Sequence, residues 1–339
     1  MATEENVILT LLKLMMEKDG SDLHLTADSP SFLRANGHLK PDQIVSSDDF
    51  WRFLKVNHID TIRLKKEKSI DFAFSFEKRR FRGNAYLAEG RPAAAIRMLP
   101  EKIPTLEDID APAGFMKLAE AQHGIIMVCG RTGEGKSTSL AALLRTITEQ
   151  RAVHVITLED PIEFRYSSTK SLIHQRELGR DFNSLSDALK ASLRENPDII
   201  LVGELRDQDC IRTALAAAES GMLVLTTLHA HTAAEAPGRL ADFFPANEQH
   251  AVRASLAASF TGIVAQRLVS APYGRHAVIE VMLRTPAISR MIRDGDDSQI
   301  PSAMLAGARQ GMTMFQQEGT RLFGSGKISE EGYQELVLR

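Results

Sequence analysis

Cysteine is nearly absent from this chain, as are the features that would place a chain in a membrane. Two cysteines among 339 residues supply neither a disulfide framework nor a four-ligand zinc site. No apolar run approaches the 18 uninterrupted residues of a transmembrane helix. Glu4 and Glu5 stand where a secretory signal would be basic. We therefore expect a cytoplasmic protein without a membrane span, which meets any membrane through a partner.

An excess of positive charge is also missing. The chain has 41 Lys and Arg against 44 Asp and Glu, a net charge of −3. Motors that act on nucleic acid need a strong basic stripe to bind phosphate, so this balance argues against a nucleic-acid partner. At 339 residues the chain is long enough for two domains, each with its own core.

The most informative stretch of the chain is residues 130–137, which fit the phosphate-binding pattern G-x-x-x-x-G-K-[ST]. The apolar residues 125–128 before it predict a buried parallel strand, and residues 139–144 after it predict the beginning of a helix. At such a turn, backbone N–H groups and the positive helix end converge on an anion. Lys136 is predicted to reach the outer phosphates, and the Ser137 hydroxyl to ligate Mg²⁺. The predicted nucleotide contacts are Gly130, Thr132, Gly133, Glu134, Gly135, Lys136, Ser137 and Thr138.

Carboxylates follow two further predicted strands. Glu159, Asp160 and Glu163 follow one apolar run, and Glu204 ends another. The carboxyl ends of parallel strands face the ligand crevice, so these acids could hold the Mg²⁺ shell or position the attacking water. We predict Glu204 as the catalytic base and Glu159 and Asp160 as part of the Mg²⁺ shell. The alternatives are a solvated acidic turn for the first three and a salt-bridging acid for Glu204.

A third apolar run, residues 222–228, ends in His229. This histidine could sense the γ-phosphate or couple the sheet to domain motion, whereas a lone histidine at a strand end is more often bonded to the backbone. Arg206 lies beside Asp207, the predicted N-cap of the next helix. Its role could be structural or could lie at a subunit boundary.

The first hundred residues predict a small α/β domain. Hydrophobic residues at helical spacing begin at Val7, and the strict alternation of residues 70–76 predicts a half-buried strand. Asn36-Gly37 offers a tight turn between two short strands. Prolines punctuate the segment that follows, which predicts an N-terminal domain at 1–100 and a linker at 101–115.

After residue 120, predicted strands alternate with predicted helices. This order predicts a mostly parallel sheet covered by helices, in an ATPase domain at 116–339. From Asn247 onward we expect helices only. The expected strands span residues 125–129, 153–158, 198–203 and 222–228.

These segments, in this order, resemble the type II/IV secretion ATPase superfamily and, within it, the PilT/PilU-like pilus retraction motors. The resemblance covers nearly the whole chain. It implies a PAS-like N-terminal α/β domain, a RecA-like P-loop ATPase domain with a helical C-terminus, and a homo-hexamer that hydrolyses ATP with Mg²⁺. The matching motifs are residues 21–25, 103–108, 159–164, 200–207, 227–229 and 266–268.

The resemblance also implies a function and the roles of single residues. Such a motor drives type IV pilus retraction and twitching motility by acting on an inner-membrane platform protein. Glu204 would activate water, Glu163 would assist the water or the metal, and His229 would take part in catalysis. Arg82 and Arg97 match family arginines that reach the nucleotide phosphates, a task suited to the planar guanidinium. The alternative for both arginines is a surface salt bridge.

Several residues depart from the family pattern. Met222 stands where the family usually places a histidine, and methionine cannot donate that hydrogen bond to a phosphate. Ser289 stands where PilT-like proteins usually carry an arginine. Arg131 and Glu134 replace small or proline residues of the P-loop. We expect Glu134 to face solvent, because an acid turned towards phosphates would repel them.

Two rival functions stay open. One is a protein-secretion motor of the same superfamily. The other is an accessory, PilU-like nucleotide-binding subunit with weak turnover, which works beside a paralogous retraction ATPase. The chain lacks the longer N-terminal region and the tetracysteine module of extension and secretion ATPases, which favours the retraction-type layout. Residues 280–286 and Phe315 favour PilU-like over PilT proper.

Overall fold

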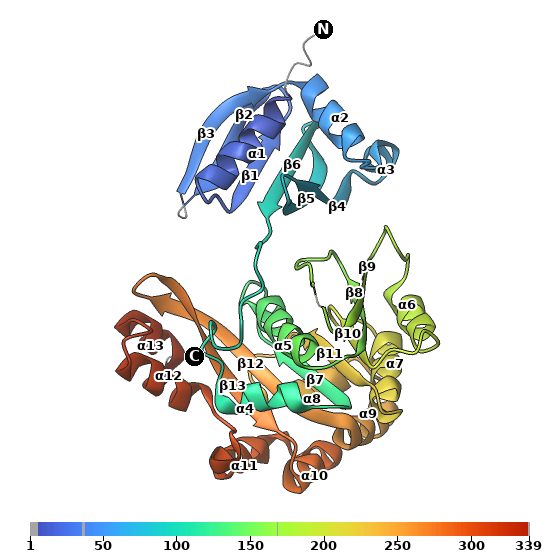
Figure 1. The fold of residues 1–339 in the computed structure, drawn as a ribbon, viewed down its shortest axis with the longest axis vertical. Coiled ribbons are helices and arrows are strands. Elements are labelled where there is room, and N and C mark those ends of the chain that lie inside the picture. The colour runs from blue at the N-terminus through green and yellow to red at the C-terminus, as the bar shows by residue number, and fades with distance from the viewer. Residues whose placement is uncertain (1–5, 36–37, 168, 338–339) are drawn as a thin grey trace. The chain divides into compact units, whose positions relative to one another are not determined.

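The computed structural model describes residues 6–35, 38–167 and 169–337. The turn predicted at Asn36-Gly37 lies outside the described residues. The chain divides into two compact units, Met1–Lys102 and Ile103–Arg339 (Figure 1). Each unit has its own hydrophobic core. Across the described ranges, no helix is long and apolar enough to cross a membrane.

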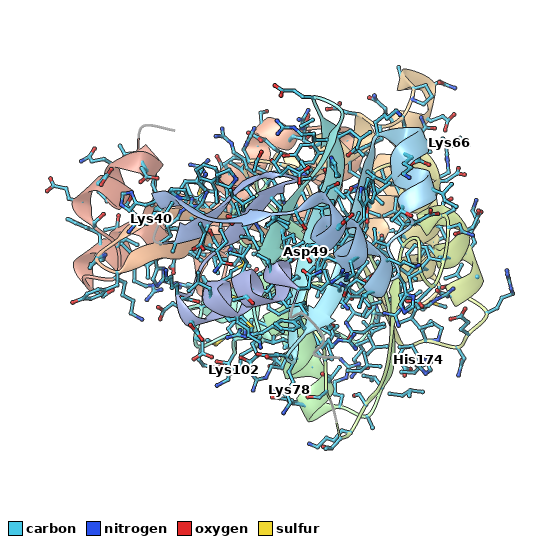
Figure 2. The ribbon with its side chains drawn as sticks, turned by 90° about the horizontal axis from the view of Figure 1, so that it is seen from above. Lys40, Asp49, Lys66, Lys78, Lys102 and His174 are labelled. Carbon is cyan, nitrogen blue, oxygen red and sulfur yellow. The ribbon has the colours of Figure 1, made fainter. Side chains whose placement is uncertain are left out.

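The first unit is an antiparallel six-stranded sheet with helices, in the strand order β3-β2-β1-β6-β5-β4. The alternating segment predicted at 70–76 is strand β4, and the predicted first helix begins at Val7. Charged side chains such as Lys40, Lys66 and Lys78 are exposed on this unit (Figure 2). Its elements are α1 (Val7–Glu17), β1 (Asp22–Thr26), β2 (Ser29–Ala35), β3 (His38–Val45), α2 (Ser47–Val56), α3 (Thr61–Glu67), β4 (Ser69–Phe76), β5 (Arg79–Ala88) and β6 (Arg91–Met98).

The second unit is a seven-stranded sheet in the order β13-β12-β7-β11-β10-β8-β9, with helices around it (Figure 1). Every neighbouring pair is parallel except β12 and β13, so the predicted mostly parallel sheet is confirmed. Up to β11 its main elements are α4 (Ala113–Lys117), β7 (Gly124–Cys129), α5 (Lys136–Gln150), β8 (His154–Glu159), β9 (Leu172–Glu177), α6 (Leu185–Ser192), β10 (Ile199–Val202), α7 (Gln208–Glu219) and β11 (Leu223–Leu228).

The remaining part of the chain corrects one expectation. The expectation that the chain is helical throughout from Asn247 was wrong, because two long strands form a hairpin between the helices. Residues 260–283 are rich in β-branched residues, which favour strands, and β12 pairs with the buried strand β7. Gly274 lies at the end of the turn between β12 and β13, with a φ of +87°. The elements are α8 (Ala236–Ala241), α9 (Ala246–Ser259), β12 (Phe260–Ala271), β13 (Gly274–Leu283), α10 (Pro286–Asp294), α11 (Ile300–Ala306), α12 (Phe315–Gly324) and α13 (Glu330–Val337).

The segment expected as a linker packs with the second unit. Leu106, Ala111 and Phe115 are buried in the core of that unit. Arg145 on α5 donates a hydrogen bond of 2.6 Å to the carbonyl oxygen of Ile103. Residues 103–115 are therefore held in place by the second unit.

Glu280 on β13 is a buried carboxylate that fastens two chain segments to the sheet. Its side chain accepts the backbone N–H of Ala233 at 2.7 Å and that of Phe315 at 3.4 Å. Burial raises the pKa of Glu280, so the folded chain binds its proton more tightly than the unfolded chain does. The stability of the fold should therefore fall as the pH rises above the ordinary glutamate value of 4.5.

A Glu280→Gln chain should lack this contribution to the pH dependence, because its amide is neutral and still offers a carbonyl acceptor. At pH 8 it should be more stable than the parent chain, and the difference should shrink towards pH 5. Glu280→Ala loses both acceptors and should unfold about 2–4 kcal/mol more easily. Urea unfolding at the two pH values measures both effects, and equal pH slopes for parent and Glu280→Gln would contradict the role of burial.

Candidate nucleotide-binding and catalytic site

The P-loop lies between β7 and α5, as the sequence predicts. Gly133 and Gly135 have φ values of +80° and +79°, a backbone conformation that favours glycine. Helix α5 begins at Lys136, so its first N–H groups point into the loop. The Lys136 Nζ donates to the carbonyl oxygens of Gly130 and Arg131 at 2.9 and 3.0 Å. The loop thus has the form that binds a nucleotide phosphate, with a lysine beside it.

Glu134 does not face solvent, so that expectation was wrong. Its residue surface is only 8% exposed, and a carboxylate oxygen accepts the N–H of Arg131 at 2.7 Å. The side chain lies against the backbone of Gly130 and Arg131 at the entry of the loop. There it satisfies a backbone donor that would otherwise have no partner inside the loop.

A glutamine from β12 supports the loop from behind. The Gln266 Nε2 donates to the carbonyl oxygen of Glu134 at 2.6 Å, and its Oε1 accepts the Ser139 hydroxyl at 2.5 Å. Gln266 is 2% exposed, and its backbone leaves no room for a side chain at Gly130. The sequence marked this glutamine only as part of a family motif. Its contact depends on β12 pairing with β7, which the sequence did not predict.

The ends of β10 and β11 bring the predicted base and the predicted histidine together. The two strands are parallel neighbours, and the Thr227 hydroxyl donates to the carbonyl oxygen of Gly203 at 2.7 Å. The Nε2 of His229 lies 2.7 Å from one carboxylate oxygen of Glu204. His229 is therefore bonded to a side chain, not to the backbone alone.

Arg206 occupies the other side of Glu204. Its Nε donates to the second carboxylate oxygen at 2.8 Å, and its Nη1 lies 3.2 Å from Asp160. The hydrogen bond to Glu204 raises the pKa of Arg206. A cavity of about 550 Å³ opens beside these residues and is lined by Glu204, Arg206 and His229 among others. Arg206 thus joins the ends of β10 and β8 within one unit.

Lys136 links this acidic cluster to the P-loop. Burial lowers the pKa of its ammonium, and the nearby charges of Glu204 and Glu163 act in the opposite direction. The lysine and the two carboxylates therefore share one electrostatic environment. The structure thus gathers P-loop and strand-end residues at the carboxyl edge of the parallel sheet, where ligands bind in such folds.

Glu159 and Asp160 differ in their surroundings. Asp160 contacts Arg206, as described above. Glu159 is buried and accepts hydrogen bonds from Thr157 at 2.6 Å and Gln175 at 3.2 Å. Burial raises its pKa to about 7. This environment suits a carboxyl group that holds the loop better than one that binds a cation directly. Within the described ranges, no group of three or more His, Cys, Asp or Glu side chains is arranged to hold a metal. The assignment of Glu159 and Asp160 to the Mg²⁺ shell stays a prediction.

Gln175 on β9 holds the acidic loop that carries Glu163. Its Nε2 also donates to the carbonyl oxygen of Phe164 at 2.8 Å, and its Oε1 accepts the N–H of Tyr166 at 3.0 Å. We expect Gln175→Ala to lower kcat about tenfold with little change in ADP affinity, because the loop loses its anchors while the P-loop stays intact. Steady-state hydrolysis and ADP titration measure the two quantities. A change in ADP affinity alone would contradict this role.

Met222 lies far from the predicted phosphate site. It precedes β11, and its carbonyl oxygen accepts the N–H of Gly124 at the amino end of β7. His229 follows the opposite end of β11, and six strand residues separate the two positions by roughly 20 Å. The Met222 side chain packs against the core. The structure therefore gives no support to a role for position 222 in direct phosphate contact.

The predicted arginines of the first unit lie side by side on its sheet. Arg82 on β5 stands directly opposite Arg97 on β6, and Arg97 stands opposite Asp22 on β1. The Arg97 Nε donates to Asp22 at 2.8 Å. The salt-bridge alternative thus holds for Arg97 in this structure, and the prediction that both arginines reach nucleotide phosphates stays open.

Comparison with known proteins gives a consistent result. A family model described as type II/IV secretion system protein matches residues 52–272. The type IV pilus retraction ATPase PilT of Pseudomonas aeruginosa is 38% identical over 334 residues, which cover 97% of each chain. The uncharacterized protein YggR of Escherichia coli K12 is 39% identical over 94% of this chain and 98% of its own. The crystal structure of the pilus retraction motor PilT with bound ADP superposes with a TM-score of 0.87, at 36% identity, over 97% of this chain and 96% of that one.

Proposed function

We infer the function of this chain from its family, since the chain belongs to the type II/IV secretion system proteins. It is an ATP hydrolase of that family. We propose that it is the motor of type IV pilus retraction, and hence of twitching motility. The observation that carries the proposal is the likeness to the retraction ATPase PilT along nearly the whole of both chains, in sequence and in fold.

The P-loop fits the phosphates of ATP by its geometry. Its glycines allow the turn, α5 presents free N–H groups, and Lys136 supplies the positive charge. Ser137 is exposed at the beginning of α5, where its hydroxyl would ligate Mg²⁺. The metal would neutralise developing charge on the transferred phosphoryl group. ATP with Mg²⁺ is accordingly the substrate that we propose.

The acidic cluster would then activate water. Glu204 lies at the end of β10 with His229 at 2.7 Å, and it would take the proton of the attacking water. His229 would hold the carboxylate in position, and Glu163 would assist from the neighbouring loop. Arg82 and Arg97 from the first unit would sense the γ-phosphate, so that hydrolysis moves one unit against the other.

We place the motor in the cytoplasm, at the inner face of the cytoplasmic membrane, as a homo-hexamer. Its proposed partners are an inner-membrane pilus platform protein and a paralogous retraction ATPase. Such an assembly needs no membrane span of its own. Hexamer formation can be measured by light scattering of the purified chain with and without Mg-ATP.

The decisive experiment combines biochemistry with a cell assay. The purified chain should hydrolyse ATP, and its expression should restore twitching to cells that lack their retraction ATPase. A Lys136→Ala chain is the control and should fail in both tests. Hydrolysis without rescue of twitching would favour the protein-secretion motor of the same family. Nucleotide binding with negligible hydrolysis would favour the accessory subunit.

A further inference from the structure

The buried carboxylate of Glu134 is an unusual group for an anion-binding loop. It is 8% exposed, and the position of a side chain on Gly130 would lie 3.0 Å from its Oε2. It accepts the N–H of Arg131. The Nε of Arg131 donates to His231 Nδ1 at 3.3 Å. Among the described residues, no salt bridge to Glu134 is present.

The charge of this carboxylate acts on the groups that attract phosphate. Glu134 and Lys136 both contact the backbone of Arg131: the carboxylate accepts its N–H at 2.7 Å, and the Lys136 Nζ donates to its carbonyl oxygen at 3.0 Å. The negative charge of Glu134 therefore offsets part of the positive potential of the lysine and of the helix end. The same carboxylate would repel a nucleotide phosphate bound in the loop, because both groups are negatively charged. Because the carboxylate is buried, water and salt screen it less than a surface charge.

The hydrogen bond of Glu134 has a separate effect. It satisfies the N–H of Arg131 at the entry of the loop, while the carbonyl oxygen of Glu134 is held by Gln266 on β12. Both bonds keep the loop in the form seen here. The charge and the hydrogen bond of one side chain thus act on nucleotide binding in opposite directions.

We propose that Glu134 sets the nucleotide affinity of this chain. Its hydrogen bond keeps the P-loop formed, and its charge makes the loop bind Mg-ADP and Mg-ATP more weakly than the loop geometry alone allows. The proposal rests on the proposed ATPase function. Weaker binding of the product lets ADP leave sooner, which suits a motor whose cycle includes product release.

The test compares three variants of the full chain by titration with Mg-ADP and by steady-state kinetics. Glu134→Gln keeps an acceptor for the N–H of Arg131 and removes the charge. It should bind Mg-ADP roughly three- to tenfold more tightly and lower the KM for ATP by a similar factor, without raising kcat. Glu134→Ala removes the acceptor as well and should melt at a lower temperature than Glu134→Gln. Glu219→Gln, at the exposed end of α7, is the control for a loss of charge elsewhere.

The outcomes separate this inference from the proposed function. If the parent chain binds Mg-ADP and hydrolyses ATP, but Glu134→Gln binds no more tightly, the inference is wrong and the function stands. An equal gain in Glu219→Gln would also overturn it, since net charge alone would then explain the effect. If neither the parent nor Glu134→Gln binds Mg-ADP, the proposed function and the inference both fail.

Discussion

A Glu204→Gln chain should still bind nucleotide and should lose ATP hydrolysis by about 10²-fold or more. The amide oxygen can still accept the Nε–H of Arg206, and the amide N–H can donate to an unprotonated Nε2 of His229, so both contacts of Glu204 can be kept. The amide cannot take a proton from water, and general-base catalysis contributes roughly 10²–10⁴ in rate. The expected result is therefore a loss of kcat with little change in the Kd for Mg-ADP. Single-turnover hydrolysis and ADP titration measure these two quantities separately.

The matched control for this substitution is Glu149→Gln. Glu149 lies at the far end of α5 and pairs with Arg145 at 2.7 Å, so its neutralisation should leave hydrolysis unchanged. Hydrolysis at the parental rate by Glu204→Gln would remove its role as the base. Loss of ADP binding in the same variant would instead make Glu204 a residue that holds the loop together, with Arg206 and Asp160 as its partners.

Local sequence was enough to predict those features of the candidate site in which a chemical motif adjoins a regular hydrophobic pattern. The P-loop, the buried strands and the order of the acids depend on residues close together in the chain. The pairing of Glu204 with His229 then follows, because adjacent parallel strands end at the same edge of a sheet. The family resemblance added the proposed roles of Arg82 and Arg97, which no local pattern indicates.

The parts that were wrong or missed depend on contacts between distant segments. The β12–β13 hairpin was expected to be helical, because its apolar residues stand in short groups and give no clear period of two. The direction of the Glu134 side chain goes with the positive φ values of the flanking glycines, and these values cannot be read from the sequence. Gln175 and Gln266 are ordinary polar residues in the sequence. They become important only because β9 and β12 carry them beneath two loops.

An Arg82→Ala chain should remain folded and should hydrolyse ATP about 10²-fold more slowly or worse. Arg82 and Arg97 are directly opposite each other on neighbouring antiparallel strands, where like charges are destabilising. Asp22 forms a salt bridge with Arg97, and among the described residues no salt bridge to Arg82 is present. A structural role would need a partner for Arg82. A half-buried guanidinium without a carboxylate partner among the described residues is explained better by an anion that binds there during turnover.

This arrangement predicts opposite effects on stability and on activity. Removal of Arg82 should leave the free energy of unfolding unchanged or raise it by up to about 0.5 kcal/mol, because a repulsion is lost. Hydrolysis should fall steeply, since an arginine that stabilises transition-state phosphate charge is worth roughly 10³–10⁵ in related reactions. Arg79→Ala is the matched control: it lies on the same strand, three residues away and so on the other face, and pairs with Glu101 at 3.3 Å. Parental kcat in Arg82→Ala would show that Arg82 does not supply the phosphate-sensing charge. So would a loss of unfolding free energy as large as the rise in the activation free energy of hydrolysis.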